Sequence, residues 1–234
     1  MYFLHMLSTS KNTGKRDPRL GVAAARRKPA ILDAAMAVIA KHGLSATTME
    51  RVAKAAGVSP GTVSFHFASK DKLLLATLDA VVLEFEAARR TAIEESAGDP
   101  ARALLALIET NLGPKVGDPR KVAVWHAFWG EAKPRRVYLE RVGSFDEAYH
   151  QSLERLFREV IERGGYLGLD AEATTYGFAG LLETLWQEIL TDGRRFDRAR
   201  ARRLAHNYLA GLFPRDFAAV AGAPENDESQ GESR

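Results

Sequence analysis

The sequence predicts an all-α protein of about nine helices, in which three short N-terminal helices precede a larger helical region. Nearly every segment between residues 28 and 213 repeats apolar residues at helical spacing. No run of alternating β-branched residues bounded by turns stands out. Charge is divided unevenly, because residues 1–75 hold 12 Lys and Arg against 4 Asp and Glu, whereas residues 76–234 hold 21 against 26. A basic first third suggests a module that binds a polyanion, and an exposed basic arm without a partner is the alternative.

The two ends of the chain are predicted to lie outside the fold. Residues 1–27 form a disordered basic arm, since residues 8–27 carry six basic residues with Gly, Pro and Ser and no apolar period. Residues 214–234 form a flexible acidic tail.

Three short helices follow the arm. Apolar residues from Ile31 to Ile39 share one face of a helix over residues 28–42, which Gly43 ends. Thr48 is placed to cap a second helix that ends at Gly57. Ser59 followed by Pro60 starts a third helix, which runs to about residue 67.

The larger region, residues 76–213, is divided by caps and turn residues. A long helix begins after Ser69 and runs towards residue 96, and Asp99 with Pro100 opens the next. A cluster of Gly and Pro at residues 113–119 separates that helix from one through Trp129. The remaining helices are expected from Pro134 to residue 164 and over residues 171–191 and 197–212.

Composition excludes several classes of function. The chain has no cysteine, so disulfides, thiolate metal sites and cysteine nucleophiles are absent. It has no phosphate loop, no HExxH and no nucleophile elbow, and its six histidines are scattered, so we expect neither an enzyme nor a bound cofactor or metal. No uncharged apolar run approaches the roughly 18 residues that cross a bilayer, and Met1–Leu7 does not have the pattern of a signal peptide. We therefore expect a cytoplasmic protein that does not span a membrane.

Residues 44–72 carry the densest pattern. A short helix, a glycine turn and a second helix capped by serine form a helix-turn-helix arrangement, whose second helix reads DNA bases in the major groove. Helix starts bind phosphate through free amides, so Thr48, Ser59 and Ser69 suit that role. An ordinary αα-hairpin is the alternative.

The run GVSPGTVSFHFxSKxxLL, residues 57–74, resembles the DNA-binding signature of TetR-family repressors. The resemblance implies that residues 28–75 are the DNA-binding domain, that Thr48 and Lys70 hold phosphates, and that Thr62 and His66 face the groove. Many members have an aromatic pair before the histidine, where this chain has Ser64 and Phe65. The predicted DNA-binding residues are Thr48, Ser59, Gly61, Thr62, Ser64, Phe65, His66 and Lys70.

Aromatic residues mark a possible ligand site in the larger domain. Trp125, Phe128 and Trp129 fall on one helix face, and Tyr138, Glu183 and Trp186 lie in helices that can converge on it. Aromatic faces with a carboxylate attract a cation, above all a quaternary ammonium. The alternative is simple core packing. The run WHAFW and the run GLLETLW resemble the C-terminal domain of choline-responsive, BetI-type repressors over about residues 100–213, which implies a choline-like effector.

Small residues suggest how two copies of the chain associate. Ala173, Gly177 and Gly180 line one side of the penultimate predicted helix, and the TetR family pairs its last two helices with those of a second subunit. Close packing within one chain is the alternative. The sequence thus predicts a ligand-responsive repressor that binds a palindromic operator in double-stranded DNA as a homodimer. Two other readings stay open: a sequence-tolerant architectural DNA-binding protein, or a TetR-family regulator with a neutral apolar effector.

Overall fold

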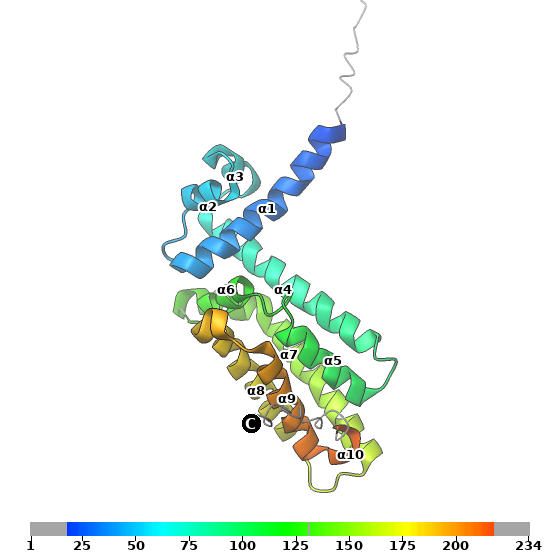
Figure 1. The fold of residues 1–234 in the computed structure, drawn as a ribbon. Helices are drawn as coiled ribbons and strands as arrows, with labels where there is room; N and C mark the ends of the chain where they lie inside the picture. Colours follow the sequence, from blue (N-terminus) through cyan, green and yellow to red (C-terminus); the bar gives the residue numbers. More distant parts are fainter. Residues whose placement is uncertain (1–17, 131, 218–234) are drawn as a thin grey trace, which may run out of the picture.

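The computed structural model describes residues 18–130 and 132–217, and every regular element within those ranges is helical (Figure 1). The all-α prediction is confirmed, with ten α-helices and a short 3-10 helix in this part of the chain where about nine helices were expected. The elements are α1 (Pro18–His42), α2 (Met49–Ala56), α3 (Pro60–His66), α4 (Lys70–Glu94), α5 (Pro100–Leu112), α6 (Pro119–Gly130), α7 (Ala132–Gly164), α8 (Ala171–Asp192), η1 (Gly193–Arg195), α9 (Arg198–Leu212) and α10 (Pro214–Phe217).

Short polar side chains set the starts of the helices, as predicted. The hydroxyl groups of Thr48, Ser59 and Ser69 accept hydrogen bonds from backbone amides in the first turns of α2, α3 and α4. Asp99 caps α5 in the same way. Gly57 ends α2 with φ of +66°, a left-handed conformation that glycine adopts without strain.

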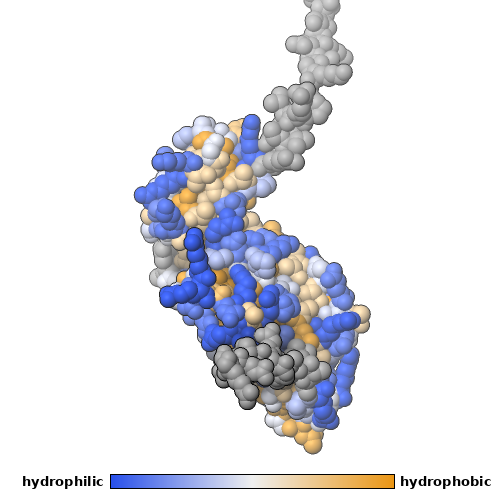
Figure 2. Space-filling view, in the orientation of Figure 1, coloured by the Kyte–Doolittle hydropathy of each residue, from blue (hydrophilic) through white to orange (hydrophobic). Residues whose placement is uncertain are grey.

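The helices form two parts that we call the head and the body. The head consists of α1, α2, α3 and the start of α4, and the body contains the rest of α4 with α5–α10 (Figure 1). The core of the head includes Ile31, Val52, Val63 and Leu73. The body packs a larger core around buried aromatic and aliphatic side chains from α5, α7, α8 and α9. On the face drawn in Figure 2, hydrophilic residues cover much of the body in groups separated by smaller apolar areas.

A third apolar cluster joins the head to the body. Met36 and Ile39 of α1 pack there with Leu78 of α4 and with Val124 and Phe128 of α6. Helices α1 and α6 therefore lie against each other at the junction of head and body.

Two boundaries differ from the predicted ones. Helix α1 begins at Pro18, ten residues before the expected start, so residues 18–27 of the predicted disordered arm are helical. Residues 214–217 of the predicted tail form α10, because Phe217 is buried against the body core. The rest of the predicted arm and tail, residues 1–17 and 218–234, lies outside the described residues.

Candidate functional site

Helix α3 is held rigidly by its own first turn. The Ser59 hydroxyl accepts from the Thr62 amide at 3.2 Å, and the two hydroxyl oxygens lie 2.9 Å apart. Pro60 occupies the first turn, where a missing amide hydrogen costs nothing. Val63 is fully buried in the head core, so α3 has one face fixed and the opposite face available.

The predicted DNA-binding residues all remain accessible on the head. Ser59, Gly61, Ser64 and Phe65 are exposed, as is Thr48, while Thr62, His66 and Lys70 are half-buried. Phe65 is 86% exposed, and its ring meets that of His66 edge to face at 5.3 Å, so most of a large apolar side chain lies in water.

Two of these positions have contacts that bear on their role. A Cβ at Gly61 would meet only the Ser59 hydroxyl oxygen, at 3.8 Å, so nothing inside the fold requires glycine there. The Lys70 ammonium donates to the carbonyl oxygen of Ser45 at 2.9 Å, which ties the start of α4 to the loop before α2. Lys70 therefore has a structural contact as well as the predicted role at DNA.

A pocket of about 620 Å³ opens in the body between helices α4–α8. Four of the predicted ligand residues line it, namely Trp125, Trp129, Glu183 and Trp186. The pocket is also lined by Phe85, Asn111, Asp146, Tyr149, His150, Tyr176, Ala179, Gly180, Leu182 and Gln187.

Aromatic rings form the floor of this pocket. Trp125 and Trp186 meet edge to face with ring centroids 6.0 Å apart, and Phe85 lies 5.8 Å from the first and 5.4 Å from the second. The Trp186 indole donates a hydrogen bond of 3.0 Å to the carbonyl oxygen of Asn111, which fixes its ring. The floor is therefore preorganised before any ligand enters.

Acidic side chains lie on the walls. Glu183 on α8 has a side chain that is 47% exposed, and one of its oxygens lies 3.7 Å from Nε2 of His126 on α6. Asp146 lines the pocket from α7. Carboxylates beside aromatic faces can bind a cation.

A buried cation lies behind the floor. The Arg89 side chain is 7% exposed and pairs with Glu86 at 3.0 Å. Its guanidinium carbon is 3.9 Å from the ring centroid of Tyr149 and 5.0 Å from that of Phe85. Burial lowers the pKa of Arg89, although the carboxylate of Glu86 opposes this effect. Burial also raises the pKa of Tyr149 to about 12, so its phenol is neutral at physiological pH.

Phe128, which was predicted for the ligand site, does not line this pocket. It is 3% exposed and packs in the apolar cluster between α1, α4 and α6 instead of lining the pocket. Successive residues of a helix are separated by about 100°, so Phe128 and Trp129 point in different directions. Tyr138 lies in α7, and its side chain is outside the described part of the structure.

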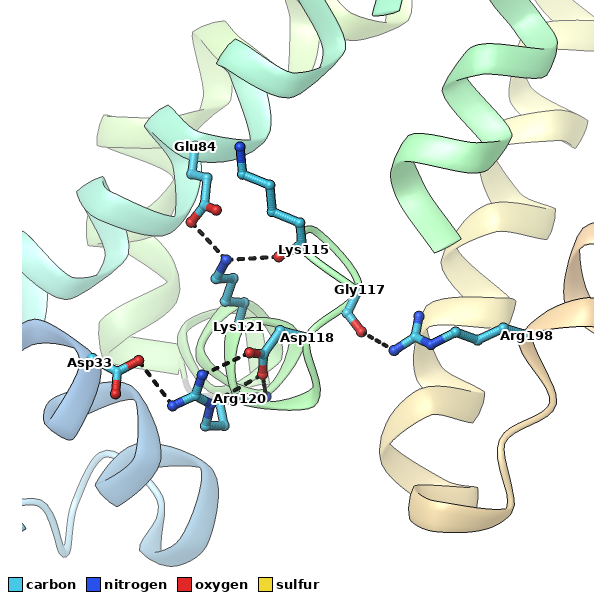
Figure 3. A network of polar contacts seen from close by, with 8 residues as sticks. All are labelled: Asp33, Glu84, Lys115, Gly117, Asp118, Arg120, Lys121 and Arg198. Carbon is cyan, nitrogen blue, oxygen red and sulfur yellow. Dashed lines mark hydrogen bonds and ion pairs between the residues drawn. The ribbon is translucent and has the colours of Figure 1, made fainter. Parts of the chain in front are cut away.

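Polar contacts hold the start of α6 against the head and the body (Figure 3). The Arg120 guanidinium pairs with Asp33 of α1 at 2.9 Å and with Asp118 at 2.8 Å. Burial alone would raise the pKa of Asp118, but hydrogen bonds from Arg120 bring it below its ordinary value. Next along the helix, Lys121 pairs with Glu84 of α4 at 2.7 Å.

The loop before α6 is held from the other side. The Arg198 guanidinium of α9 donates to the carbonyl oxygen of Gly117 at 2.7 Å (Figure 3). Helix α6 thus joins two sites, because its first turn contacts the head while Trp125 and Trp129 line the pocket.

The strip of small residues on α8 is packed within the chain at one position and exposed at two others. The hydroxyl of Tyr208 on α9 occupies the space that a Cβ at Gly177 would need, so this glycine allows close packing within the chain. Ala173 and Gly180 are exposed, and nothing lies within 4 Å of a Cβ built at Gly180. Gly180 also lines the pocket, so the mouth of the pocket is beside this strip.

Several pocket residues were not predicted. Phe85 and Tyr149 fit the apolar stripes of their helices, and that pattern does not distinguish a pocket residue from a core residue. Asn111 carried a usable signal, since a polar residue on the apolar stripe of Leu104, Leu107 and Ile108 is unusual, and it is 3% exposed. Asp146 gave no signal, because only the tertiary packing of α7 brings it to the pocket.

Two further properties concern the described residues alone. No helix in residues 18–130 and 132–217 has the length and hydropathy needed to cross a membrane. In the same ranges, no group of three or more His, Asp or Glu side chains is arranged to hold a metal ion.

Family models match both parts of the chain. Residues 31–77 match the model of bacterial regulatory proteins of the tetR family. Residues 100–214 match the model of the C-terminal region of BetI-type transcriptional repressors.

Individual relatives agree with these matches. The HTH-type transcriptional regulator BetI 2 of Chromohalobacter salexigens is 31% identical over 195 residues, which cover 82% of this chain and 90% of the relative. A putative transcriptional regulator of Saccharomonospora viridis, solved in complex with choline, has a TM-score of 0.63 at 23% identity and covers 79% of this chain and 96% of its own. A putative regulator of Pseudomonas aeruginosa has a TM-score of 0.64 at 24% identity, covering 91% and 99%. These relatives are regulators, in agreement with the prediction that the chain is not an enzyme. The chain belongs to the TetR family of transcriptional regulators, and its C-terminal domain is of the BetI type.

Proposed function

We propose that this chain is a cytoplasmic repressor that binds a palindromic operator as a homodimer and releases it when a choline-like cation enters the pocket of the body. The observation that carries the proposal is the position of α6, which contacts the head through Arg120 and lines the pocket through Trp125 and Trp129. A shift of α6 on ligand binding can therefore reach the helices of the head, which contact DNA.

The proposed DNA binding is supported by the exposed face of α3. Its exposed face offers Ser64 and Phe65, with Thr62 and His66 at the edges, all of a size that enters the major groove. Thr48, Ser59 and Lys70 lie at or beside helix starts, where free amides and a positive charge favour phosphate.

The dimer rests on the exposed strip of α8. Ala173 and Gly180 let a partner helix approach closely, and exposed apolar side chains on α8 and α9, such as Leu190 and Leu204, add area to be covered. Two-fold symmetry of the protein requires two-fold symmetry of the operator, with half-sites about 34 Å or a multiple apart.

The cationic effector rests on the chemistry of the pocket. Trp129 and Glu183 lie at its opening, where a cation beside a partly exposed indole face gains about 0.5–1 kcal/mol. The choline complex of the Saccharomonospora viridis neighbour supports this choice. A sequence-tolerant architectural protein would have no need of such a pocket.

Selection of bound duplexes from a random DNA pool tests the DNA end. We expect enrichment of a palindrome, and the absence of any enriched sequence would contradict sequence-specific DNA binding.

Lys70→Ala should weaken binding to all DNA sequences and reduce the slope of log affinity against log salt concentration by about one unit, since it removes one phosphate contact. Lys41→Ala, which changes an exposed lysine in the last turn of α1, is the matched control. Thr62→Ala should instead relax base preference by about 1–3 kcal/mol.

Sedimentation tests the subunit seam. Gly180→Leu places a branched side chain on the exposed strip, so we expect it to weaken both the dimer and operator binding. A variant that remained dimeric with unchanged operator affinity would place the interface elsewhere.

A further inference from the structure

The pocket is larger than a choline-like head group needs. Its volume is about 620 Å³. Choline has about seven non-hydrogen atoms, and at about 30 Å³ each, the share of a water molecule in the liquid, they fill about 210 Å³. About two thirds of the pocket is then left for another part of the effector. Pockets of about 300–1,000 Å³ ordinarily bury most of the surface of a drug-sized ligand.

The pocket also changes in character with depth. At its floor, Phe85, Leu182 and Trp186 are 8%, 4% and 6% exposed. At its opening, Trp129 is 47% exposed, and the Glu183 side chain is 47% exposed as well. The negative charge of Glu183 therefore lies at the rim, and the deep surface is mainly apolar, with the buried Asn111 as a polar member and the half-buried Asp146 on the wall of α7.

Arg89 occupies the far side of the rings at the floor. Its buried guanidinium lies against the rings of Phe85 and Tyr149, both of which line the pocket, and it pairs with Glu86 at 3.0 Å. The faces of these rings that are turned to Arg89 already contact a cation whose charge is balanced, so the floor offers a ligand no unpaired negative charge. The floor thus favours hydrocarbon.

We infer that the effector is an amphiphilic ammonium whose cationic head lies at the rim beside Trp129 and Glu183, and whose alkyl or aryl body fills the floor between Phe85 and Trp186. The inference rests on the proposed function, because it takes a cation as the effector. It adds the chemical class of the ligand and its orientation in the pocket.

A series of alkyltrimethylammonium salts tests the inference. Calorimetry on the full-length protein would measure Kd for chains from methyl to octyl, each below its micelle-forming concentration. Burial of each methylene contributes about 0.8 kcal/mol, so Kd should fall about fourfold per added carbon. The neutral alcohol 1-octanol is the matched control, and it should bind more weakly than octyltrimethylammonium.

Two variants test the rim and the deeper part of the pocket separately. Glu183→Gln should raise Kd for every member of the series by a similar factor and leave the dependence on chain length intact, because the carboxylate lies at the rim. Ala179→Phe places a ring in the space of the half-buried Ala179, which lines the pocket, and should flatten that dependence.

The outcomes distinguish this inference from the function on which it rests. Equal Kd values for tetramethylammonium and octyltrimethylammonium would overturn the amphiphilic effector and leave a small cationic effector in place. Equal binding of 1-octanol and octyltrimethylammonium would overturn the cationic rim. No binding by any member at millimolar concentration would contradict both the inference and the proposed cationic effector.

Discussion

Phe128 and Phe65 should respond in opposite ways to the same truncation. Phe128 is 3% exposed in the cluster between α1, α4 and α6, whereas Phe65 is 86% exposed on α3. Phe128→Ala removes a buried ring, which costs about 3–5 kcal/mol in the free energy of unfolding. For a chain of this size, each kcal/mol corresponds to about 2–4 °C, so Tm should fall by about 6–20 °C. Phe65→Ala should change stability by no more than about 0.5 kcal/mol, because its ring contacts mainly water.

Thermal unfolding at one fixed protein concentration measures the first effect, and anisotropy with a labelled operator measures the second. Phe65→Ala should lose operator affinity while keeping Tm. A Phe128→Ala variant that unfolded within about 2 °C of the parent, yet no longer bound the cation, would refute the assignment of Phe128 to the core and return it to the ligand site.

Three further predictions follow from contacts inside the chain. Gly177→Ala should not bring the gain of about 1 kcal/mol that Gly→Ala ordinarily gives inside a helix, as measured by urea titration, because its Cβ meets the Tyr208 hydroxyl, and combining it with Tyr208→Phe should restore part of that gain. Burial lowers the pKa of His206 below 6.5, so the native state binds this proton less readily and stability should fall as pH drops through 6.5. His206→Gln should remove that part of the acid sensitivity; an unchanged pH profile would assign it to other groups. Asp33→Asn should cost less than about 1 kcal/mol of stability, because its pair with Arg120 is largely exposed, and a larger loss would show that the pair outweighs the apolar contact between head and body.

Local chemistry explains why the head could be predicted from the sequence. Thr48, Ser59 and Ser69 cap helices through amides only three residues away, and Gly57 ends α2 through its own backbone freedom. Such interactions need no information about distant parts of the chain.

The pocket was predictable only in part, because it depends on packing between helices that are far apart in sequence. Trp125 and Trp129 share a face, and that face does line the pocket. The spacing of Trp125, Phe128 and Trp129 predicts a single buried face on α6. The helix is instead packed on two sides, with Phe128 against the head and the two tryptophans at the pocket. The pair of the buried Arg89 and the half-buried Glu86, three residues apart, has the spacing of an ordinary surface pair on a helix.

The start of α1 at Pro18 shows a different limit. Residues 18–27 have little apolar periodicity, so their pattern favoured an irregular arm. Alanine and arginine at residues 23–27 are strong helix formers, and that intrinsic propensity extends the helix backwards from the part anchored by Ile31.

The coupling between pocket and head is tested most directly by operator affinity measured with and without the cation. The dissociation constant of the selected palindrome would be determined by anisotropy, first alone and then with saturating choline or octyltrimethylammonium. A coupling of about 1–3 kcal/mol predicts that Kd rises by about 5–150-fold, and by linkage the operator must weaken cation binding by the same factor. An operator Kd that stayed the same at full occupancy of the pocket would contradict release by a cationic effector.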